Sequence, residues 1–399
     1  MRNADRGMRN GGGDCFVACL ILIATFSAHV VADAPKVIRV ETAAQLVEAA
    51  KASARQSVEV RIIGRFESPV VVWPPSEHGL LISGGDISFS TLSRQAYDSR
   101  QVMNGWYFEP RPRVIISGVK FGQYDGGGGM LKVDHDFDGP WTLTGCRVME
   151  VGSRQFPPFK EQPKHAGDVW YSNVINGGWR TSWFVTNNTF INCCRASKYG
   201  HVFYPGGVKD KPNRSTAVIA HNRFVACSGT LAMIYVVHAE VRNNTFVPGL
   251  AWDDQGQRWR YYFEINAGNE TELAVHDNSV IGMMGTWIHG DIPAYLSSDR
   301  NDFSEATLAG AFAVRDGKWV TLEQWRALGH DANSVWPGEL KSSNNKKEDL
   351  LAEVQTTLDC ADPCDCNKDG TIDIRDLQAI KVHIDAATNQ AGDRQTQEK

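Results

Sequence analysis

The sequence predicts an all-β fold, a right-handed parallel β-helix, and most of that prediction rests on one repeated sequence motif. Within residues 186–303 an Asn and an apolar residue recur two positions apart, each time beside a short β-rich run. Successive copies are 34, 22, 34 and 23 residues apart, with no helical pattern between them. Such repeats are typical of a solenoid, because one unit cannot bury its own apolar face and copies must stack. The five copies are Asn187-Asn188-Thr189-Phe190, His221-Asn222-Arg223-Phe224, Asn243-Asn244-Thr245-Phe246, Asp277-Asn278-Ser279-Val280 and Arg300-Asn301-Asp302-Phe303.

The Asn of each copy predicts a corner between two strands. Asn tolerates the left-handed backbone that a sharp turn needs, and its amide can hydrogen-bond the Asn of the coils above and below. Stacked coils lie about 4.8 Å apart, so the five Asn are expected to form one internal ladder. Two upstream segments look like earlier copies without the Asn, Gly118-Val119-Lys120-Phe121 and Gly145-Cys146-Arg147-Val148.

Two cysteines provide a check on this register. Cys193 and Cys227 each follow the Phe of their repeat by three residues, so stacking predicts that one lies above the other. Neighbouring strands fall within the Cα separation that a disulfide allows, roughly 4.4–6.8 Å. The sequence leaves open whether the two form a disulfide or a pair of buried thiols.

Residues 1–32 are predicted to be a secretory signal peptide. Arg2, Arg6 and Arg9 precede an apolar run over residues 15–26, and small residues follow at a plausible cleavage point. The run is shorter than the about 20 apolar residues of a membrane span, so no membrane span is expected. Export would place the protein outside the cell, in the periplasm or on the cell surface, where disulfides are permitted. Three basic and two acidic residues lie in this segment, so the net charge of −5 becomes −6 without it, which argues against a nucleic-acid partner.

A short helix is predicted at each end of the solenoid. Thr42 and Gln45 form a capping-box pattern before apolar residues at helical spacing, and a helix there would cover the open edge of the first coil. Thr321 and Gln324 repeat the pattern at the other end. The predicted organisation is a signal peptide at 1–32, a β-helix domain at 33–338, a polar linker at 339–349 and a tail at 350–399.

The region before the repeats holds candidates for binding. Asp134, Asp136 and Asp138 alternate, so on a strand they would share one face, which suits Ca²⁺; a solvated acidic loop is the alternative, and the one we favour. The glycines at 126–129 predict a flexible turn. The polar and aromatic insert at 152–180 is of the kind that builds the binding face of a solenoid. The predicted substrate-binding residues are His165, Trp170, Trp179 and Lys209.

Residues 193–239 hold the densest set of titratable side chains next to the repeats. His201 and Tyr235 each lie eleven residues past the Phe of their repeat, so the register predicts that they are vertical neighbours. β-Elimination beside a uronate carboxylate needs a cation to neutralise that carboxylate, a base at the α-proton and an acid for the leaving oxygen. This segment supplies candidates for all three. The alternative is that these side chains lie on solvated loops and have no catalytic role. The predicted catalytic residues are Lys198, His201, Arg214, Tyr235 and His238.

A glycoside hydrolase is a different possibility for the same scaffold. It needs two carboxylates about 5–9.5 Å apart, for which Asp253, Asp254 and Glu264 are candidates beside the aromatic residues Trp259 and Tyr261. Adjacent Asp residues on one strand point to opposite faces, which weakens this version.

The tail contains a pattern typical of an EF-hand calcium loop at residues 365–376. Oxygen-bearing side chains occupy loop positions 1, 3, 5, 9 and 12, a backbone carbonyl is available at position 7, and Gly370 allows the sharp turn at position 6. The predicted Ca²⁺ ligands are Asp365, Asn367, Asp369, Thr371, Asp373 and Asp376.

The tail also resembles a dockerin type I repeat. Asp376 in the last loop position and the continuation Leu377-Gln378-Ala379-Ile380-Lys381-Val382-His383-Ile384 carry the resemblance. Dockerins have two such repeats and one is found here. The resemblance implies Ca²⁺ binding and leaves a cohesin-like or cell-surface partner as an expectation.

Residues 36–335 resemble the pectate-lyase-like family of right-handed β-helices. The first helix, the Asn-x-Phe repeats and the closing helix after Thr321 carry this resemblance. The family includes lyases, hydrolases, epimerases and non-catalytic adhesins. Neither an Arg-x-x-Pro-x-x-Arg lyase motif nor the paired-Asp motifs of polygalacturonases is found in the sequence, and fold does not settle function.

These observations together predict an exported, Ca²⁺-binding β-helix protein that acts on polysaccharide. The favoured activity is cleavage of an acidic polysaccharide by β-elimination. A glycoside hydrolase is the first alternative, and a non-catalytic carbohydrate-binding or cell-surface protein is the second.

Overall fold

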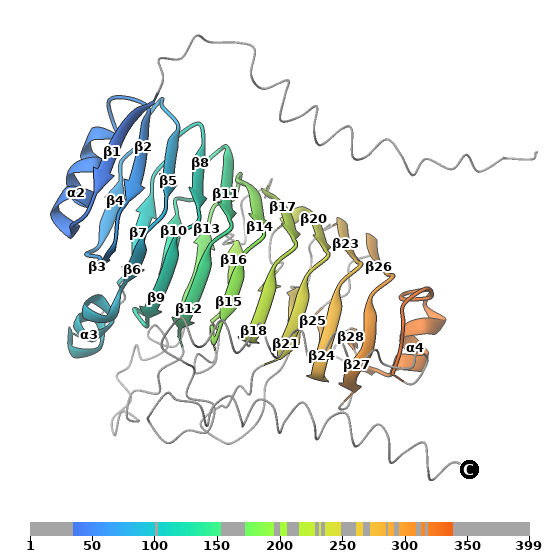
Figure 1. Cartoon of the computed structure of the whole chain (residues 1–399). Helices are drawn as coiled ribbons and strands as arrows, with labels where there is room; N and C mark the ends of the chain where they lie inside the picture. Colours follow the sequence, from blue (N-terminus) through green and yellow to red (C-terminus); the bar gives the residue numbers. More distant parts are fainter. Residues whose placement is uncertain are drawn as a thin grey trace, which may run out of the picture. The chain divides into compact units, whose positions relative to one another are not determined.

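The protein, described here from a computed structural model, forms a right-handed parallel β-helix, which confirms the predicted fold class. The chain passes repeatedly through three parallel sheets, called A, B and C here, in that order (Figure 1). The structure describes residues 35–99, 103–152, 172–194, 200–205, 215–227, 231–232, 236–248, 261–265, 272–284, 286–290, 295–308, 313–315 and 318–337.

Sheet A contains ten strands in the described part of the chain, all parallel to their neighbours. Its strands, in spatial order, are β1 (Lys36–Val40), β2 (Val58–Ile62), β5 (Leu80–Ser83), β8 (Val114–Ser117), β11 (Pro140–Thr144), β14 (Ser182–Thr186), β17 (Ser215–Ala220), β20 (Val236–Arg242), β23 (Glu272–His276) and β26 (Tyr295–Asp299).

Sheet B contains nine strands in the same described residues, and the repeated sequence motif leads into its strands. Its strands are β3 (Arg65–Glu67), β6 (Asp86–Ser88), β9 (Lys120–Tyr124), β12 (Arg147–Val151), β15 (Thr189–Ile191), β18 (Arg223–Cys227), β21 (Thr245–Pro248), β24 (Ser279–Met284) and β27 (Asp302–Leu308).

Sheet C contains ten described strands, of which the last pair is antiparallel. Its strands are β4 (Val71–Trp73), β7 (Trp106–Phe108), β10 (Gly129–Val133), β13 (Asn173–Gly177), β16 (Phe203–Pro205), β19 (Leu231–Ala232), β22 (Tyr261–Ile265), β25 (Thr286–Gly290), β28 (Ala313–Arg315) and β29 (Lys318–Val320).

The predicted Asn ladder is confirmed at the corner between sheets A and B. The side-chain amide of each ladder Asn donates to the side-chain oxygen of the next, at 3.0 Å in all four steps. Each of these Asn is buried, and the adjacent Phe rings stack in the core with centroids 5.0 Å apart. The ladder consists of Asn188, Asn222, Asn244, Asn278 and Asn301.

The left-handed backbone of this corner lies one residue before the predicted position. The residue that precedes each ladder Asn has a φ between 54° and 58°. This explains why Gly118 and Gly145 hold the same place in the upstream copies, with φ of 62° and 61°. The ladder Asn itself is retained for its hydrogen bonds. The left-handed residues of the Asn-containing coils are Asn187, His221, Asn243, Asp277 and Arg300.

Both predicted capping boxes are confirmed. The α2 helix (Ala43–Ala52) begins after Thr42, and the α4 helix (Leu322–Ala327) begins after Thr321; in each case the Thr side chain and the third helical residue bond reciprocally. The two helices lie at opposite ends of the stack (Figure 1). A further helix, α3 (Ser90–Ser99), leaves the stack between β6 and β7.

The structure decides two predictions about the region before the repeats. The glycines at 126–129 do lie at a turn between β9 and β10, but the turn is buried and packed instead of flexible: the Gly126 carbonyl accepts from Met103 and the Gly129 amide donates to Asn104. Asp134 follows the end of β10 and opens a turn in which Asp136 and Asp138 are exposed, so the favoured prediction of a solvated acidic loop is confirmed and the three aspartates do not share a strand face.

Residues 1–32, 339–349 and 350–399 lie outside the described residues, so the signal peptide, the linker and the calcium loop stay predictions. Among the residues that the structure describes, no helix has the length and apolarity needed to cross a membrane.

Candidate functional site

The outer face of sheet C is the best-formed candidate site in the described part of the chain. The longest connection between strands enters this sheet, since β12 ends at Val151 and β13 begins at Asn173, and a second long connection enters it between Ser88, where β6 ends, and Trp106, where β7 begins. A sheet face bordered by long connections is where solenoids usually bind their ligands.

Four polar side chains form one row across this face, called the sheet C row: Tyr107, Lys132, Asn176 and Tyr204. They are register partners on consecutive strands, β7, β10, β13 and β16. Each lies between two inward-facing residues of its strand and is itself partly exposed, so the row faces outward. Neighbouring members are separated by one strand spacing of about 4.8 Å.

Lys132 and Asn176 are joined directly within the row. The Lys132 Nζ donates to the Asn176 Oδ1 at 2.8 Å. Burial lowers the pKa of Lys132, and the charge of Asp134 opposes that shift. A lysine whose pKa is lowered has a larger neutral fraction near neutral pH, which is the form that can accept a proton.

Tyr107 is held by the carboxylate that follows β10. Its hydroxyl donates to the Asp134 Oδ2. Burial raises the pKa of Tyr107 and the Asp134 hydrogen bond raises it further, so the phenol stays protonated. The Asp134 side chain is itself fixed, because its Oδ1 accepts the backbone N–H of Asp136 at 2.8 Å.

Two of the predicted site residues lie beside the row. His201 precedes β16, is buried, and its ring lies 5.5 Å from that of Tyr204. Trp179 follows β13, but its side chain is mostly buried, and its ring lies tilted against that of His135 with centroids 4.6 Å apart. Trp179 therefore packs against the turn that contains Asp134 instead of presenting an open face.

His238 lies elsewhere, on the outer face of sheet A. It belongs to β20, is exposed, and its Nδ1 lies 3.1 Å from the Glu272 Oε2. The structure thus places His201 beside sheet C and His238 on sheet A, so these two predicted catalytic residues are not brought together.

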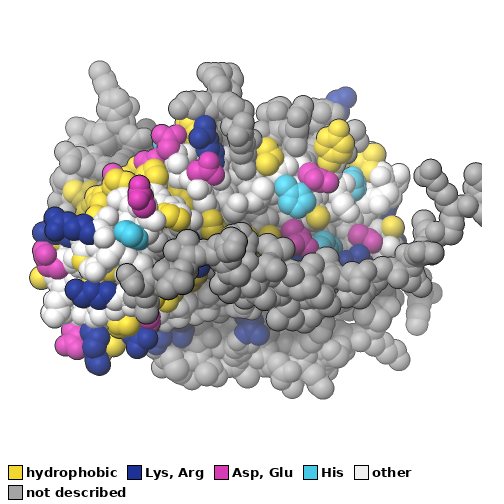
Figure 2. Space-filling model, turned by 90° about the horizontal axis from the view of Figure 1, so that it is seen from above, with side chains coloured by type: hydrophobic (Ala, Val, Ile, Leu, Met, Phe, Trp, Pro, Cys, Tyr) yellow, Lys and Arg dark blue, Asp and Glu magenta, His cyan; other side chains and the backbone are white. Residues whose placement is uncertain are grey.

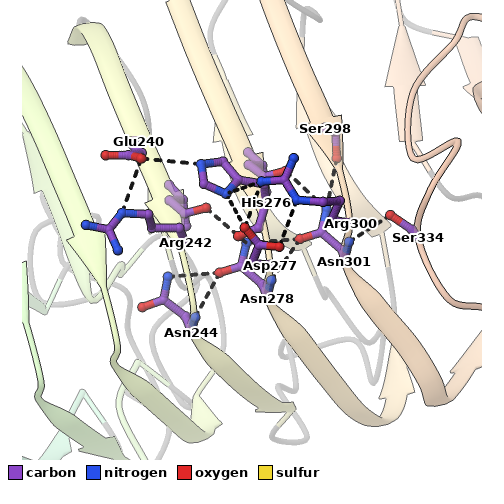
Figure 3. Close-up of polar contacts among 12 residues, drawn as sticks. Glu240, Arg242, Asn244, His276, Asp277, Asn278, Ser298, Arg300, Asn301 and Ser334 are labelled. Atoms are coloured by element: carbon purple, nitrogen blue, oxygen red, sulfur yellow. Dashed lines mark hydrogen bonds and ion pairs between the residues drawn. The ribbon is translucent and has the colours of Figure 1, made fainter. Parts of the chain in front are cut away.

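Further along the same face is an ion network formed by Glu240, Arg242, His276, Asp277 and Arg300 (Figure 3). The His276 ring bridges two carboxylates, with 3.3 Å to Glu240 and 2.7 Å to Asp277. Hydrogen bonds from Arg300 hold the pKa of Asp277 below its usual value. Every acid in the network is already paired with a base of a neighbouring strand or residue, so the network favours a structural role.

Charges of both signs are interspersed on the surface seen from above in Figure 2, together with histidine and hydrophobic groups. Among the described residues no group of three or more His, Cys, Asp or Glu side chains is arranged to hold a metal ion.

The remaining predicted residues fall outside the part of the chain that the structure describes. This holds for the catalytic candidates Lys198, Arg214 and Tyr235, the substrate-binding candidates His165, Trp170 and Lys209, the hydrolase candidates Asp253 and Asp254, and the calcium ligands Asp365, Asn367, Asp369, Thr371, Asp373 and Asp376. Only the backbone position of Glu264 is described, in β22, where it pairs with His289 of β25.

Sequence reasoning named no member of the row as a site residue. Tyr204 lies within the titratable segment at 193–239, whereas Tyr107, Lys132 and Asn176 were missed entirely. A signal was present, because each is a polar residue between two inward-facing neighbours, as in Trp106-Tyr107-Phe108 and Leu131-Lys132-Val133. Recognising it required the register between strands separated by up to 44 residues.

The fold defines the class of this protein as a parallel β-helix. No known family matches the sequence, and no curated protein matches it. The structure is similar to the crystal structure of alginate lyase from Paenibacillus sp. str. FPU-7, with a TM-score of 0.48 and 12% sequence identity over 77% of this chain and 99% of that chain. At this level of similarity neither activity nor catalytic residues transfer from one chain to the other.

Proposed function

We propose that this protein is a polysaccharide lyase that cleaves a uronate-containing polysaccharide by β-elimination on the outer face of sheet C. The observation that carries the proposal is the Lys132–Asn176 pair, a partly buried lysine of lowered pKa held against an amide in the centre of an outward-facing row.

Lys132 is the proposed base. In the reaction it removes the proton α to the uronate carboxylate, the electron pair forms a carbon–carbon double bond, and the glycosidic bond to the leaving oxygen breaks. A neutral amine is required for this step, and burial favours that form of Lys132.

Asn176 is the proposed partner of the uronate carboxylate. Its Oδ1 accepts from Lys132, which leaves the amide nitrogen as a donor to a carboxylate. One neutral donor is weak compensation for a full charge, and Lys198 and Arg214 remain the proposed cations. In the sequence they belong to the connections on either side of β16.

Tyr204 is the proposed acid for the leaving oxygen. It lies one strand beyond Asn176 in the row. Tyr107, on the other side of Lys132, is tied to Asp134, so it is better placed to fix one end of the row than to donate a proton to substrate.

The proposal is tested by following the ultraviolet absorbance of the unsaturated product on a panel of uronate polymers. We expect the Lys132→Met variant to lose about 10²–10⁴-fold in kcat/KM, the usual contribution of a general base. Lys120→Met is the matched control, because Lys120 is an exposed lysine on sheet B, and it should leave the rate unchanged. Circular dichroism checks that both variants are folded.

Each other outcome removes the proposal. New reducing ends without ultraviolet absorbance would indicate a glycoside hydrolase. Binding without cleavage would indicate a carbohydrate-binding protein. Cleavage that survives in Lys132→Met would show that the base lies elsewhere.

We also propose that the protein is exported and that its tail binds Ca²⁺. The support is the sequence alone: an apolar segment behind three arginines in residues 1–32, and the EF-hand pattern at residues 365–376. A cohesin-like or cell-surface partner of the tail is part of this proposal.

A further inference from the structure

Cys193 and Cys227 occupy the same place in two consecutive coils. Ile191 of β15 pairs with Val225 of β18, and the next residue in each coil is left-handed, with φ of 51° and 52°. The backbone therefore turns in the same way before each cysteine, and the two side chains enter the core one above the other. The stacking predicted from the sequence is confirmed.

The two thiols are buried and adjacent. Cys193 is 0% exposed and Cys227 is 4% exposed, and Cys227 lies near enough to raise the pKa of Cys193. Each thiol donates to the carbonyl two residues before it, at 3.4 Å. The Cys227 thiol further contacts the Phe190 carbonyl of the preceding coil at 3.4 Å, so it points toward the coil that contains Cys193.

The other described cysteines are directed elsewhere. The Cys146 thiol lies 3.7 Å from the Ile116 carbonyl, and the Cys194 thiol lies 3.5 Å from the Ser172 carbonyl. Among the described cysteines, Cys193 and Cys227 thus occupy stacked positions in consecutive coils.

We propose that Cys193 and Cys227 are an oxidisable pair that forms a disulfide between consecutive coils while the chain folds, with another disulfide as the oxidant. Neighbouring parallel strands place Cα atoms about 4.8 Å apart, which is within the roughly 4.4–6.8 Å span of a disulfide. Closing the bond requires rotation of the two thiols away from the carbonyls that they now contact.

The chemistry is thiol–disulfide exchange. The thiolate of one cysteine attacks the sulfur–sulfur bond of the oxidant and displaces a thiolate; the second cysteine then attacks the mixed disulfide and releases the other half. The two cysteines lose two protons and two electrons, and the oxidant is reduced to two thiols.

Burial of the two thiols determines the stage of folding at which the exchange can occur. In the folded coil, burial raises the pKa of Cys193, and the adjacent Cys227 raises it further, so little thiolate forms. Exchange therefore has to occur before the two coils close. Once formed, the bond is shielded from reductants by the same burial.

The bond would enclose a segment that contains five of the candidate site residues. Between the two cysteines lie Lys198, His201, Tyr204, Lys209 and Arg214. A disulfide at the base of this loop removes unfolded-state entropy and fixes both ends of the segment that supplies Tyr204 to the sheet C row. This inference does not depend on the proposed enzymatic activity.

The test compares full-length protein refolded with oxidised and reduced glutathione against protein refolded in reductant. Peptide mapping without reduction should show the Cys193 peptide linked to the Cys227 peptide. The oxidised form should melt roughly 5 °C higher than the reduced form, as expected for a loop of this length in a chain of this size. The folded, oxidised protein should keep its bond in reductant until denaturant is added.

Variants separate this bond from general packing effects. Cys193→Ser and Cys227→Ser should each abolish the difference in melting temperature between the two refolding conditions, whereas Cys194→Ser, at an adjacent buried cysteine, should retain it. If a serine variant does not fold, the comparison of oxidised and reduced wild type decides. Alkylation of both Cys193 and Cys227 in unreduced, denatured protein overturns the proposal, and so does linkage of either one to a different cysteine.

Discussion

Replacement of Asn244 with Ala tests the Asn ladder at its centre. Asn244 is 1% exposed, and its amide nitrogen donates to the Asn278 Oδ1 at 3.0 Å and to the Ile219 carbonyl at 2.9 Å. Its Oδ1 accepts from the backbone N–H and from the side-chain amide of Asn222, at 2.9 and 3.0 Å. The substitution removes all four bonds at once.

The expected loss in the free energy of unfolding follows from the buried polar groups that lose a hydrogen-bond partner. The backbone N–H of Asn222, one N–H of its amide and the Ile219 carbonyl each lose this partner while remaining inside the coil. The Asn278 Oδ1 keeps its bond from the Asn244 backbone N–H. An unsatisfied buried polar group costs about 1–3 kcal/mol, and some of these groups keep another bond, so we expect the free energy of unfolding to fall by about 4 kcal/mol.

Urea unfolding measures this loss, with Asn243→Ala as the control. Asn243 is the exposed left-handed neighbour, with a φ of 54°, and its replacement should cost about 1 kcal/mol of backbone strain. Circular dichroism and tryptophan fluorescence should give coincident transitions, so that the midpoints can be converted to free energies. If Asn244→Ala costs no more than Asn243→Ala, the ladder is not a major source of stability and the reasoning fails.

Three further predictions concern single charges. Asp134→Asn removes a charge that favours protonated Lys132, so the ascending, low-pH limb of the pH–rate profile, where the base loses its proton, should move to lower pH; an unmoved limb would count against Lys132 as the base. Asp277 has a pKa lowered mainly by the Arg300 hydrogen bond, so the pair stabilises the fold above the unfolded Asp pKa of about 3.9 and loses that effect as pH falls through the lower folded value. Arg300→Ala should therefore cost less than about 1 kcal/mol at neutral pH, since the pair is largely exposed, and nothing at strongly acid pH; an equal urea midpoint shift at both pH values would contradict this. Asp365→Ala should weaken Ca²⁺ binding in a calorimetric titration and leave the circular dichroism of the β-helix unchanged, and an unaltered titration would exclude the EF-hand assignment.

The parts of the fold that sequence could predict are those with a local signature. The Asn-x-Phe motif sets the register of sheet B, and the reciprocal Thr and Gln bonds define where α2 and α4 begin. The left-handed position was misplaced by one residue because two copies contain Asn twice in succession, at Asn187-Asn188 and Asn243-Asn244, and either Asn suits a corner.

The candidate site could be predicted only in part, since its residues have no shared local pattern. Lys132 and Asn176 are 44 residues apart in sequence, and most of the insert at 152–180 lies between them. Sheet C has no repeated sequence motif of its own. The coils also differ in length, so spacing alone does not show that His201 lies beside sheet C while His238 lies on sheet A.

The Asn ladder has a direction, and this has an electrostatic consequence. In every bond between ladder residues the amide nitrogen donates toward the C-terminal end of the stack and the amide oxygen accepts from the N-terminal side; Figure 3 shows the last three residues of this row. The amides therefore share one orientation along the axis. The donor end of this row meets the buried Asp331 carboxylate, which accepts from the Asn301 amide at 2.8 Å and is also bonded by Ser298, Ser334 and Trp325. The solenoid therefore ends its row of dipoles with a countercharge, much as an anion complements the N-terminus of a helix. A chain cut before Asp331 would lose that countercharge together with α4's anchoring tryptophan bond, and unravelling would be expected to start from this end.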